Sequence, residues 1–205
     1  DHKYEVKGQI ADIAPEAIEN VLAEPHAKNT LPAIAWAVKQ IYKKDPGAMV
    51  GVFASDHAID SEPDFLDAWK VAEEAAKDDY LVLLGIKPHE PSTGYGYIKP
   101  NNKISEGALP VFEVEQFVEK PDADAAKEYV ANGYLWNSGM FVFKAKAFMQ
   151  MLTDHQPEMA AQFATMNDEN FKQTYENFKN ISIDYGLAEK VNKVAVVPVD
   201  MAWRD

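Results

Sequence analysis

Two short runs of apolar residues, each bounded by polar or turn-forming residues, place the strongest constraint on how this chain can fold. Residues 48–54 and 80–86 are almost continuously apolar rather than alternating, which is typical of strands buried on both faces of a parallel sheet. Between them, apolar residues recur at helical spacing over residues 65–76. The three segments together predict a β-α-β unit, and therefore an α/β fold.

Helices and strands continue to alternate along the rest of the chain. A helix is expected over residues 30–42, with Thr30 as its N-cap and Pro32 in its first turn. Further strands are expected over residues 95–99, 112–118, 137–143 and 194–199, and further helices over residues 123–131, 145–153, 169–178 and 183–191. No internal repeat or flexible linker divides the 205 residues, so we predict a single domain spanning residues 1–205.

Composition excludes several classes of function. The chain has no cysteine, which rules out disulfides and thiolate metal sites and fits a reducing cytosol. Its formal net charge of -13 opposes binding to nucleic acid or to an anionic membrane. No apolar run approaches the roughly 18 residues of a membrane span, and the first residues have no signal-peptide layout. We therefore expect a soluble, cytoplasmic protein in which any phosphate ligand is met by local cations or by a metal ion.

Polar residues stand at the ends of the apolar runs, where α/β proteins build small-molecule sites. Glu119 and Lys120 follow the run at residues 112–118, and a carboxylate beside an ammonium suits a phosphorylated sugar. A solvated ion pair on a surface strand is the alternative for these two residues. Asp56 follows the run at residues 48–54 and can either hold a divalent cation or cap the next helix, and the residues alone do not choose between the two.

Six ordered segments carry a resemblance to a known family. They are residues 28–35 (Lys-Asn-Thr-Leu-Pro-Ala-Ile-Ala), 55–57 (Ser-Asp-His), 93–98, 117–121, 136–141 and 182–185 (Ser-Ile-Asp-Tyr). In order and spacing they resemble the mannose-1-phosphate guanylyltransferases, a branch of the sugar-nucleotide pyrophosphorylases. The similarity runs from about Glu24 to Asp205. It implies a Rossmann-like nucleotide-diphospho-sugar transferase fold, with a mixed, mostly parallel sheet flanked by helices.

The resemblance also implies roles for individual residues. Nucleotide contacts are expected from Asn29, Thr30, Ser55 and Asp56. Sugar contacts are expected from Gly94, Tyr95, Glu119, Lys120, Asn137 and Asp184, with Gly96 a second glycine near the sugar. Asp56 and Asp205 are the expected ligands of Mg²⁺, and with Lys120 they form the expected catalytic set. Thr30 and Asp184 also have structural readings, as a helix cap and as part of a first helical turn, whereas His57 is given a structural role only.

The reaction implied by the resemblance is attack by the phosphate of mannose 1-phosphate on the α-phosphorus of GTP, which gives GDP-mannose and pyrophosphate. The nucleophile is already an anion, so no general base is expected, and the protein must align and neutralise the two polyanions. The expected partners are therefore GTP, mannose 1-phosphate and GDP-mannose. A homodimer is one of the possible assemblies, and the sequence does not fix the number of subunits.

The sequence also departs from the family pattern. It contains no Gly-rich phosphate loop, and the family's Trp-Ser-Asp motif is represented by Trp203, Arg204 and Asp205. We therefore expect an internal segment of a longer enzyme, lacking the first strand and phosphate loop, that is weak or inactive by itself. Two alternatives remain: a noncatalytic relative that only binds a sugar nucleotide, and a pyrophosphorylase for another sugar or base.

Overall fold

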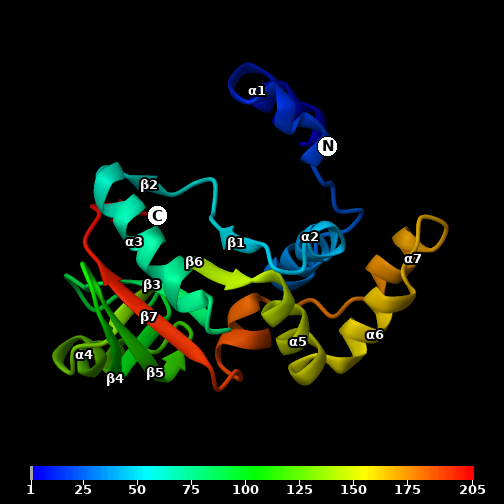
Figure 1. Ribbon diagram of the computed structural model, residues 1–205. Coiled ribbons are helices and arrows are strands. Elements are labelled where there is room, and N and C mark those ends of the chain that lie inside the picture. The colour runs from blue at the N-terminus through cyan, green and yellow to red at the C-terminus, as the bar shows by residue number, and fades with distance from the viewer. Residues whose placement is uncertain (1) are drawn as a thin grey trace.

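The computed structural model describes residues 2–205 and contains a central sheet with helices packed against both of its faces (Figure 1). The strands of the sheet lie in the order β1-β6-β3-β7-β5-β4. Their bounds are β1 (Met49–Val52), β3 (Leu81–Ile86), β4 (Tyr97–Glu106), β5 (Pro110–Val118), β6 (Leu135–Lys144) and β7 (Val194–Val199). A separate two-stranded ribbon pairs β2 (Ala58–Ile59) with β8 (Trp203–Arg204).

Helices make up most of the remaining chain. They are α1 (Lys3–Ile13), α2 (Thr30–Lys44), α3 (Glu62–Ala76), α4 (Ala123–Ala131), α5 (Ala145–His155), α6 (Pro157–Thr165) and α7 (Phe171–Glu176), with a 3₁₀ turn η1 (Pro15–Asn20) and a π-helical turn η2 (Asp184–Ala188). Helix α1 has no buried residue and lies apart from the sheet (Figure 1). No helix among residues 2–205 combines the length and the hydropathy needed to cross a bilayer.

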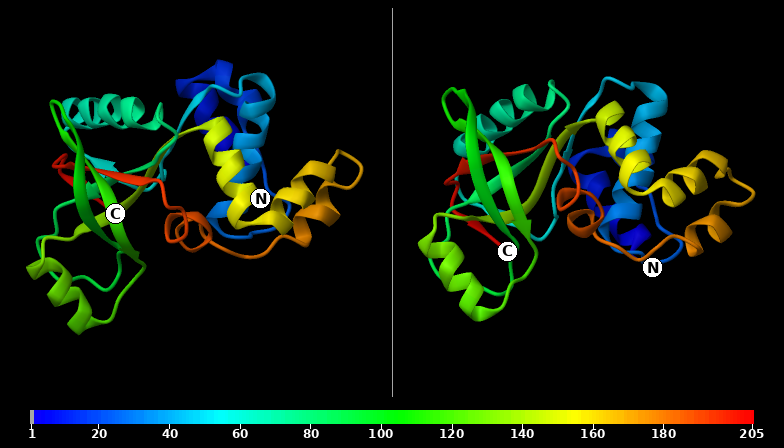
Figure 2. Two further views of the ribbon diagram at one scale, coloured as in Figure 1. Left: turned by 60° about the horizontal axis from the view of Figure 1, so that its bottom comes forward. Right: turned by 90° about the horizontal axis from the view of Figure 1, so that it is seen from below.

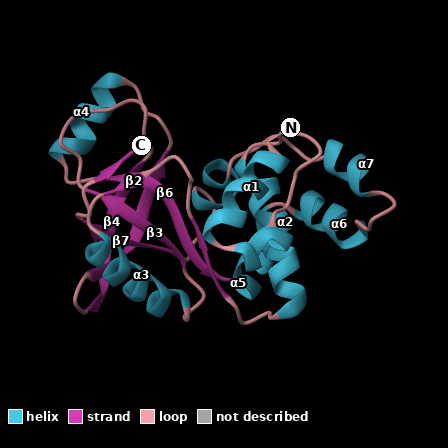
Figure 3. Cartoon of the chain, turned by 90° about the horizontal axis from the view of Figure 1, so that it is seen from above, coloured by secondary structure: helices cyan, strands magenta, loops and turns pink. Residues whose placement is uncertain are grey.

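Strand β3 shows why the sheet is covered on both faces. All six of its residues are buried, and neighbouring side chains in a strand point to opposite faces. Leu81 and Leu83 join the apolar cluster that contains α2, α5 and α6, whereas Val82 and Leu84 join the cluster built around α3. The helices α2, α5, α6 and α7 gather beside the sheet (Figure 2), and α4 lies at its far end (Figure 3).

The fold class predicted from the sequence is confirmed, but strand direction differs from the expectation of a mostly parallel sheet. Among the paired strands of residues 2–205, only β3 and β7 are parallel. Strand β6 lies between β1 and β3 and is antiparallel to both, so the β-α-β unit is split by a strand from much later in the chain. The start of β6 also pairs with β4, and the ladder of β6, β3, β7, β5 and β4 closes on itself.

Three local expectations also need correction. A helix at residues 157–165 was not expected, although Pro157 at its start and buried Met159 and Phe163 at i, i+4 spacing mark it. The helix expected over residues 183–191 is only the short π-helical turn η2. Thr30 is not an N-cap, because Asn29 takes that place and accepts a hydrogen bond from the Thr30 N–H at 2.8 Å.

Candidate functional site

The residues predicted at the sugar side line one cavity of about 150 Å³. All six lie there, together with Asp205: Gly94, Tyr95, Glu119, Lys120, Asn137 and Asp184. A larger cavity, of about 550 Å³, lies between α3 and the β4–β5 hairpin, and none of the predicted site residues lines it. A binding site needs convergent polar groups as well as volume. We take the smaller cavity as the candidate site, because the predicted polar residues converge there.

The residues that follow β5 bring a carboxylate and an ammonium group to this cavity. The carboxylate of Glu119 and the ammonium of Lys120 are 3.3 Å apart. The Glu119 side chain is only 12% exposed, whereas that of Lys120 is 61% exposed. Lys120 has a φ of 44°, a left-handed conformation that costs a non-glycine residue about 1–2 kcal/mol. This strained turn lies just after β5. Next to it, the Glu119 carboxylate lies in the wall of the cavity, and the Lys120 ammonium lies at its exposed edge.

Asn137 is held rigidly by its neighbours. Its side-chain amide donates to Asp184 Oδ1 at 2.9 Å, and its Oδ1 accepts from the Gly139 N–H at 3.1 Å. Its backbone N–H donates to the Gly96 carbonyl at 2.8 Å. These bonds join β6, η2 and the loop before β4 around the cavity. Asn137 is therefore a fixed element of the site rather than a mobile surface amide.

Burial dominates the electrostatics of the two carboxyl groups in the cavity. It raises the pKa of Glu119, and the charge of Asp184 raises it further, while the ion pair with Lys120 works in the opposite direction. Burial likewise raises the pKa of Asp184, against the opposing effect of its hydrogen bonds, including the one from Asn137. The cavity thus holds two carboxyl groups that are poorly solvated, and nearby hydrogen bonds and Lys120 offset only part of the cost of their burial. Such carboxyl groups are suited to accept hydrogen bonds from sugar hydroxyls.

The raised pKa of Asp184 predicts how stability depends on pH. The folded state holds the proton of Asp184 to higher pH than the unfolded state, so its contribution to stability falls as pH rises from the unfolded pKa, near 4, through the folded pKa. Asp184→Asn removes this titration and can still accept from Asn137. We expect the variant to melt above the wild type at about pH 8 and to lose that advantage towards about pH 4, as measured by thermal unfolding. Asp12→Asn, on exposed α1, is the control, and an equal advantage at both pH values would contradict the prediction.

The predicted nucleotide side adjoins this cavity. Thr30 Oγ1 accepts from the backbone N–H of Ile183 at 2.9 Å, which ties the start of α2 to the segment carrying Asp184. Thr30 lines a second cavity of about 300 Å³ that shares His57, Gly139 and Asp184 with the first. Asn29, Ser55 and Asp56 line neither cavity, and their contact with a nucleotide stays a prediction.

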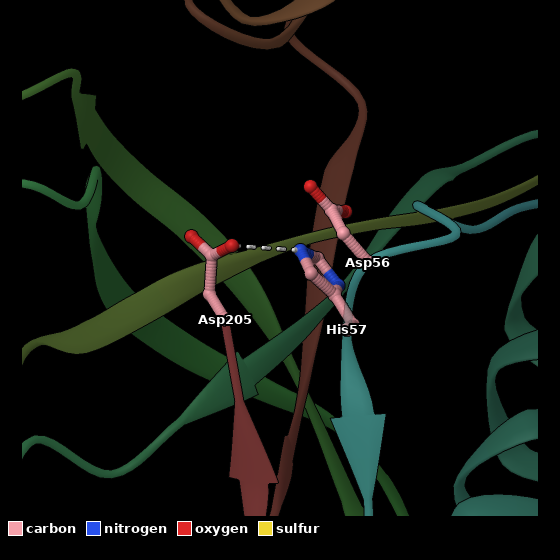
Figure 4. A group of neighbouring side chains, drawn as sticks. All are labelled: Asp56, His57 and Asp205. Carbon is pink, nitrogen blue, oxygen red and sulfur yellow. Dashed lines mark ion pairs between the residues drawn. The ribbon is translucent and has the colours of Figure 1, made fainter.

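A third group lies at the rim of the candidate site. Asp56, His57 and Asp205 each offer a ligand atom, and these atoms lie within 4.8 Å of one another (Figure 4). This set can hold a divalent cation, because two carboxylate oxygens are suitable ligands for Mg²⁺. Sequence reasoning gave His57 only a structural role, and no spacing pattern marked it. Arg204, which departs from the family pattern, instead pairs with Asp60 at 2.9 Å and is 66% exposed.

Comparison with known proteins settles the family. The family model described as "Nucleotidyl transferase" matches residues 1–205. The chain belongs to the nucleotidyl transferase family. A curated relative from Klebsiella pneumoniae, named mannose-1-phosphate guanylyltransferase, is 36% identical over 215 residues, which cover 100% of this chain and 45% of the relative. The chain therefore spans about half the length of the curated relatives that it matches.

Solved structures agree with this family and fold. A crystal structure from Thermus thermophilus, described as mannose-1-phosphate geranyltransferase, superposes with a TM-score of 0.80 at 28% identity. The superposition covers 98% of this chain and 65% of the Thermus thermophilus chain. A Helicobacter pylori structure, described as mannose-6-phosphate isomerase, has a TM-score of 0.77 at 28% identity, with coverage of 97% and 82%. For this nucleotidyl transferase, the family and fold expected from the sequence are thus confirmed, whereas the roles of individual residues stay predictions.

Proposed function

We propose that this nucleotidyl transferase, in its full-length form, transfers GMP from GTP to mannose 1-phosphate, giving GDP-mannose and pyrophosphate. The names of its relatives support the sugar and the base. The chemistry of the cavity supports the class of substrate. Glu119, Asn137 and Asp184 offer acceptors and a donor for hydroxyl groups, and Lys120 offers a cation for a phosphate.

One observation carries the proposal: the cavity with the sugar-side residues adjoins the cavity at the start of α2. The two share His57, Gly139 and Asp184 as a common wall. A sugar phosphate in the first and a nucleotide in the second would therefore meet with their phosphates near Asp56 and Asp205. Transfer between two substrates requires this adjacency, because most of the catalytic gain comes from holding the reacting groups together.

In the proposed reaction, an oxygen of the sugar phosphate attacks the α-phosphorus of GTP. The bond from that phosphorus to the bridging oxygen breaks, and pyrophosphate leaves with the electron pair. The nucleophile is already an anion, so no side chain has to remove a proton. The exposed ammonium of Lys120 offsets charge on the sugar side. Asp56 and Asp205 would hold Mg²⁺, which when bound neutralises charge on the phosphate oxygens.

Calorimetric titration of GDP-mannose into the chain tests the proposal. We expect Lys120→Ala to weaken binding about tenfold, since one exposed charge-assisted hydrogen bond contributes about 1.4 kcal/mol. Lys127→Ala is the matched control, because Lys127 is an equally exposed lysine (64%) that lines neither cavity. UDP-glucose is the competitor, and equal binding of the two ligands would favour a pyrophosphorylase for another sugar or base.

A turnover assay with the full-length protein separates catalysis from binding. Release of pyrophosphate that depends on mannose 1-phosphate supports the transferase. Selective binding of GDP-mannose without turnover would favour a noncatalytic relative instead. Arg204 gives that alternative little support, because its guanidinium pairs with exposed Asp60 and does not line the cavity.

A further inference from the structure

The imidazole of His57 has no task in the proposed reaction, yet its surroundings are unusual. Its side chain is only 10% exposed. Its Nδ1 is buried without a hydrogen-bond partner within residues 2–205, whereas its Nε2 faces Asp205 Oδ1 at 3.8 Å. The ring is held edge-on against Trp203, with ring centroids 5.3 Å apart. A buried nitrogen without a partner is costly and rare in native proteins, and the packing that buries Nδ1 leaves Nε2 as the ring nitrogen that faces Asp205.

The pairing of β2 with β8 fixes which residue His57 faces. Ala58 lies opposite Arg204, and Ile59 lies opposite Trp203. One further step in the same register places His57 opposite Asp205. Residues directly opposite each other in an antiparallel pair project their side chains to the same side. The ribbon therefore directs the imidazole and the Asp205 carboxylate towards one point, and Asp56, next to His57 in the chain, lies beside them (Figure 4).

The separation between these groups suits a shared ion better than a hydrogen bond. His57 Nε2 and Asp205 Oδ1 are 3.8 Å apart, beyond the roughly 2.7–3.2 Å of a hydrogen bond. Two ligands bound to one ion at about 2.1 Å each lie roughly 3–4 Å from one another. Asp56 offers an oxygen in the same cluster, within 4.8 Å of the other ligand atoms.

We propose that His57 Nε2 is a direct ligand of the divalent cation, the third beside Asp56 and Asp205. The inference rests on the cation site of the proposed function and extends it to a ligand of another chemical type. A nitrogen ligand raises affinity for first-row transition ions more than for Mg²⁺, which prefers oxygen. The site accordingly binds Mn²⁺ more tightly than a pair of carboxylates alone would, and its preference for Mn²⁺ over Mg²⁺ depends on His57.

Pulsed electron paramagnetic resonance of Mn²⁺ bound to the whole chain tests this assignment directly. Nitrogen coordination produces a modulation of the echo, which we expect in the wild type and not in His57→Gln. We also expect His57→Gln to weaken Mn²⁺ binding about tenfold or more, with a smaller effect on Mg²⁺. The matched control is His89→Gln, because His89 likewise packs edge-on against a tryptophan, Trp136, at 4.8 Å but lies outside the cluster.

Two outcomes would overturn the assignment. Mn²⁺ that binds the wild type without nitrogen modulation shows that His57 is not a ligand. If Asp56→Asn then abolishes the binding, the two-carboxylate site of the proposed function still stands. Absence of any Mn²⁺ binding to the wild type also overturns the assignment. In that case, titration of GDP-mannose in the absence of metal still tests the proposed sugar-side cavity. Circular dichroism of each variant establishes that a loss of metal reflects the ligand and not the fold.

Discussion

Replacing Gly96 by alanine is expected to weaken binding of GDP-mannose by about 10- to 100-fold with little change in stability. A Cβ at Gly96 would lie 2.5 Å from Glu119 Oε2. It would also lie 3.2 Å from Phe117 Cζ and 3.4 Å from Asn137 Cβ, both of which are tight but tolerable contacts. The carboxylate is the free end of a flexible side chain, so Glu119 can turn away and the fold survives.

The expected loss follows from what the turned Glu119 can no longer do. In the proposed function it accepts hydrogen bonds from sugar hydroxyls, and a hydrogen bond to a charged group contributes about 1.5–3 kcal/mol. That free energy corresponds to about a 10- to 100-fold change in affinity. Gly107→Ala is the matched control, because a Cβ there meets only the Leu109 carbonyl oxygen at 3.6 Å and Gly107 does not line the candidate cavity. Calorimetric titration measures the affinities, and thermal unfolding measures the stabilities.

A double-mutant cycle establishes whether the effect passes through Glu119. If it does, Gly96→Ala adds almost nothing in a Glu119→Ala background, because the carboxylate that it displaces is already gone. A full additional loss in that background would mean that the Cβ obstructs the ligand itself. The proposed contact of Glu119 with the sugar would then lose its support.

Runs of apolar residues predicted the strands well, but not their directions. The expectation for residues 194–199 coincides with β7, and residues 80–86 contain the whole of β3. Burial on both faces produces such runs whether the neighbouring strand is parallel or antiparallel. The antiparallel β6 is inserted between β1 and β3 from a position more than 80 residues later than β1, and no local pattern encodes that pairing.

The candidate site was predictable where its residues stand at strand ends or within the resembling segments. Glu119, Lys120 and Asn137 were predicted in this way, and they do line one cavity. The bond from Asn137 to Asp184 joins residues 47 positions apart, and only the folded chain reveals it. His57 was missed because its approach to Asp205 depends on a ribbon of two residues per strand, too short for any periodicity to mark.

The second large effect is expected at Asn29, where strain and predicted function coincide. Asn29 has φ 66° and ψ -171°, a region that is almost restricted to glycine and costs other residues about 1–3 kcal/mol. Its side chain compensates in part by accepting from the Thr30 N–H at 2.8 Å. Replacing an asparagine N-cap by glycine costs only a few tenths of a kcal/mol, so relief of strain outweighs the lost hydrogen bond.

We therefore expect Asn29→Gly to stabilise the fold by about 1 kcal/mol, after allowing for the greater chain entropy of an unfolded glycine. For a chain of this size the thermal midpoint should rise by about 2–4 °C. Asn101→Gly is the matched control: Asn101 is an exposed asparagine in β4 without a positive φ, and glycine there should destabilise by about 0.5–1 kcal/mol.

Stability and binding should move in opposite directions at Asn29. The family resemblance implies that Asn29 contacts the nucleotide, and if it does, the stabilised variant is expected to bind GDP-mannose less tightly than the wild type. Strained conformations persist where a side chain is needed in one orientation, and the strain is then retained for function. If Asn29→Gly raises the midpoint and leaves the affinity unchanged, the strain serves only to start α2, and the predicted nucleotide contact of Asn29 is wrong.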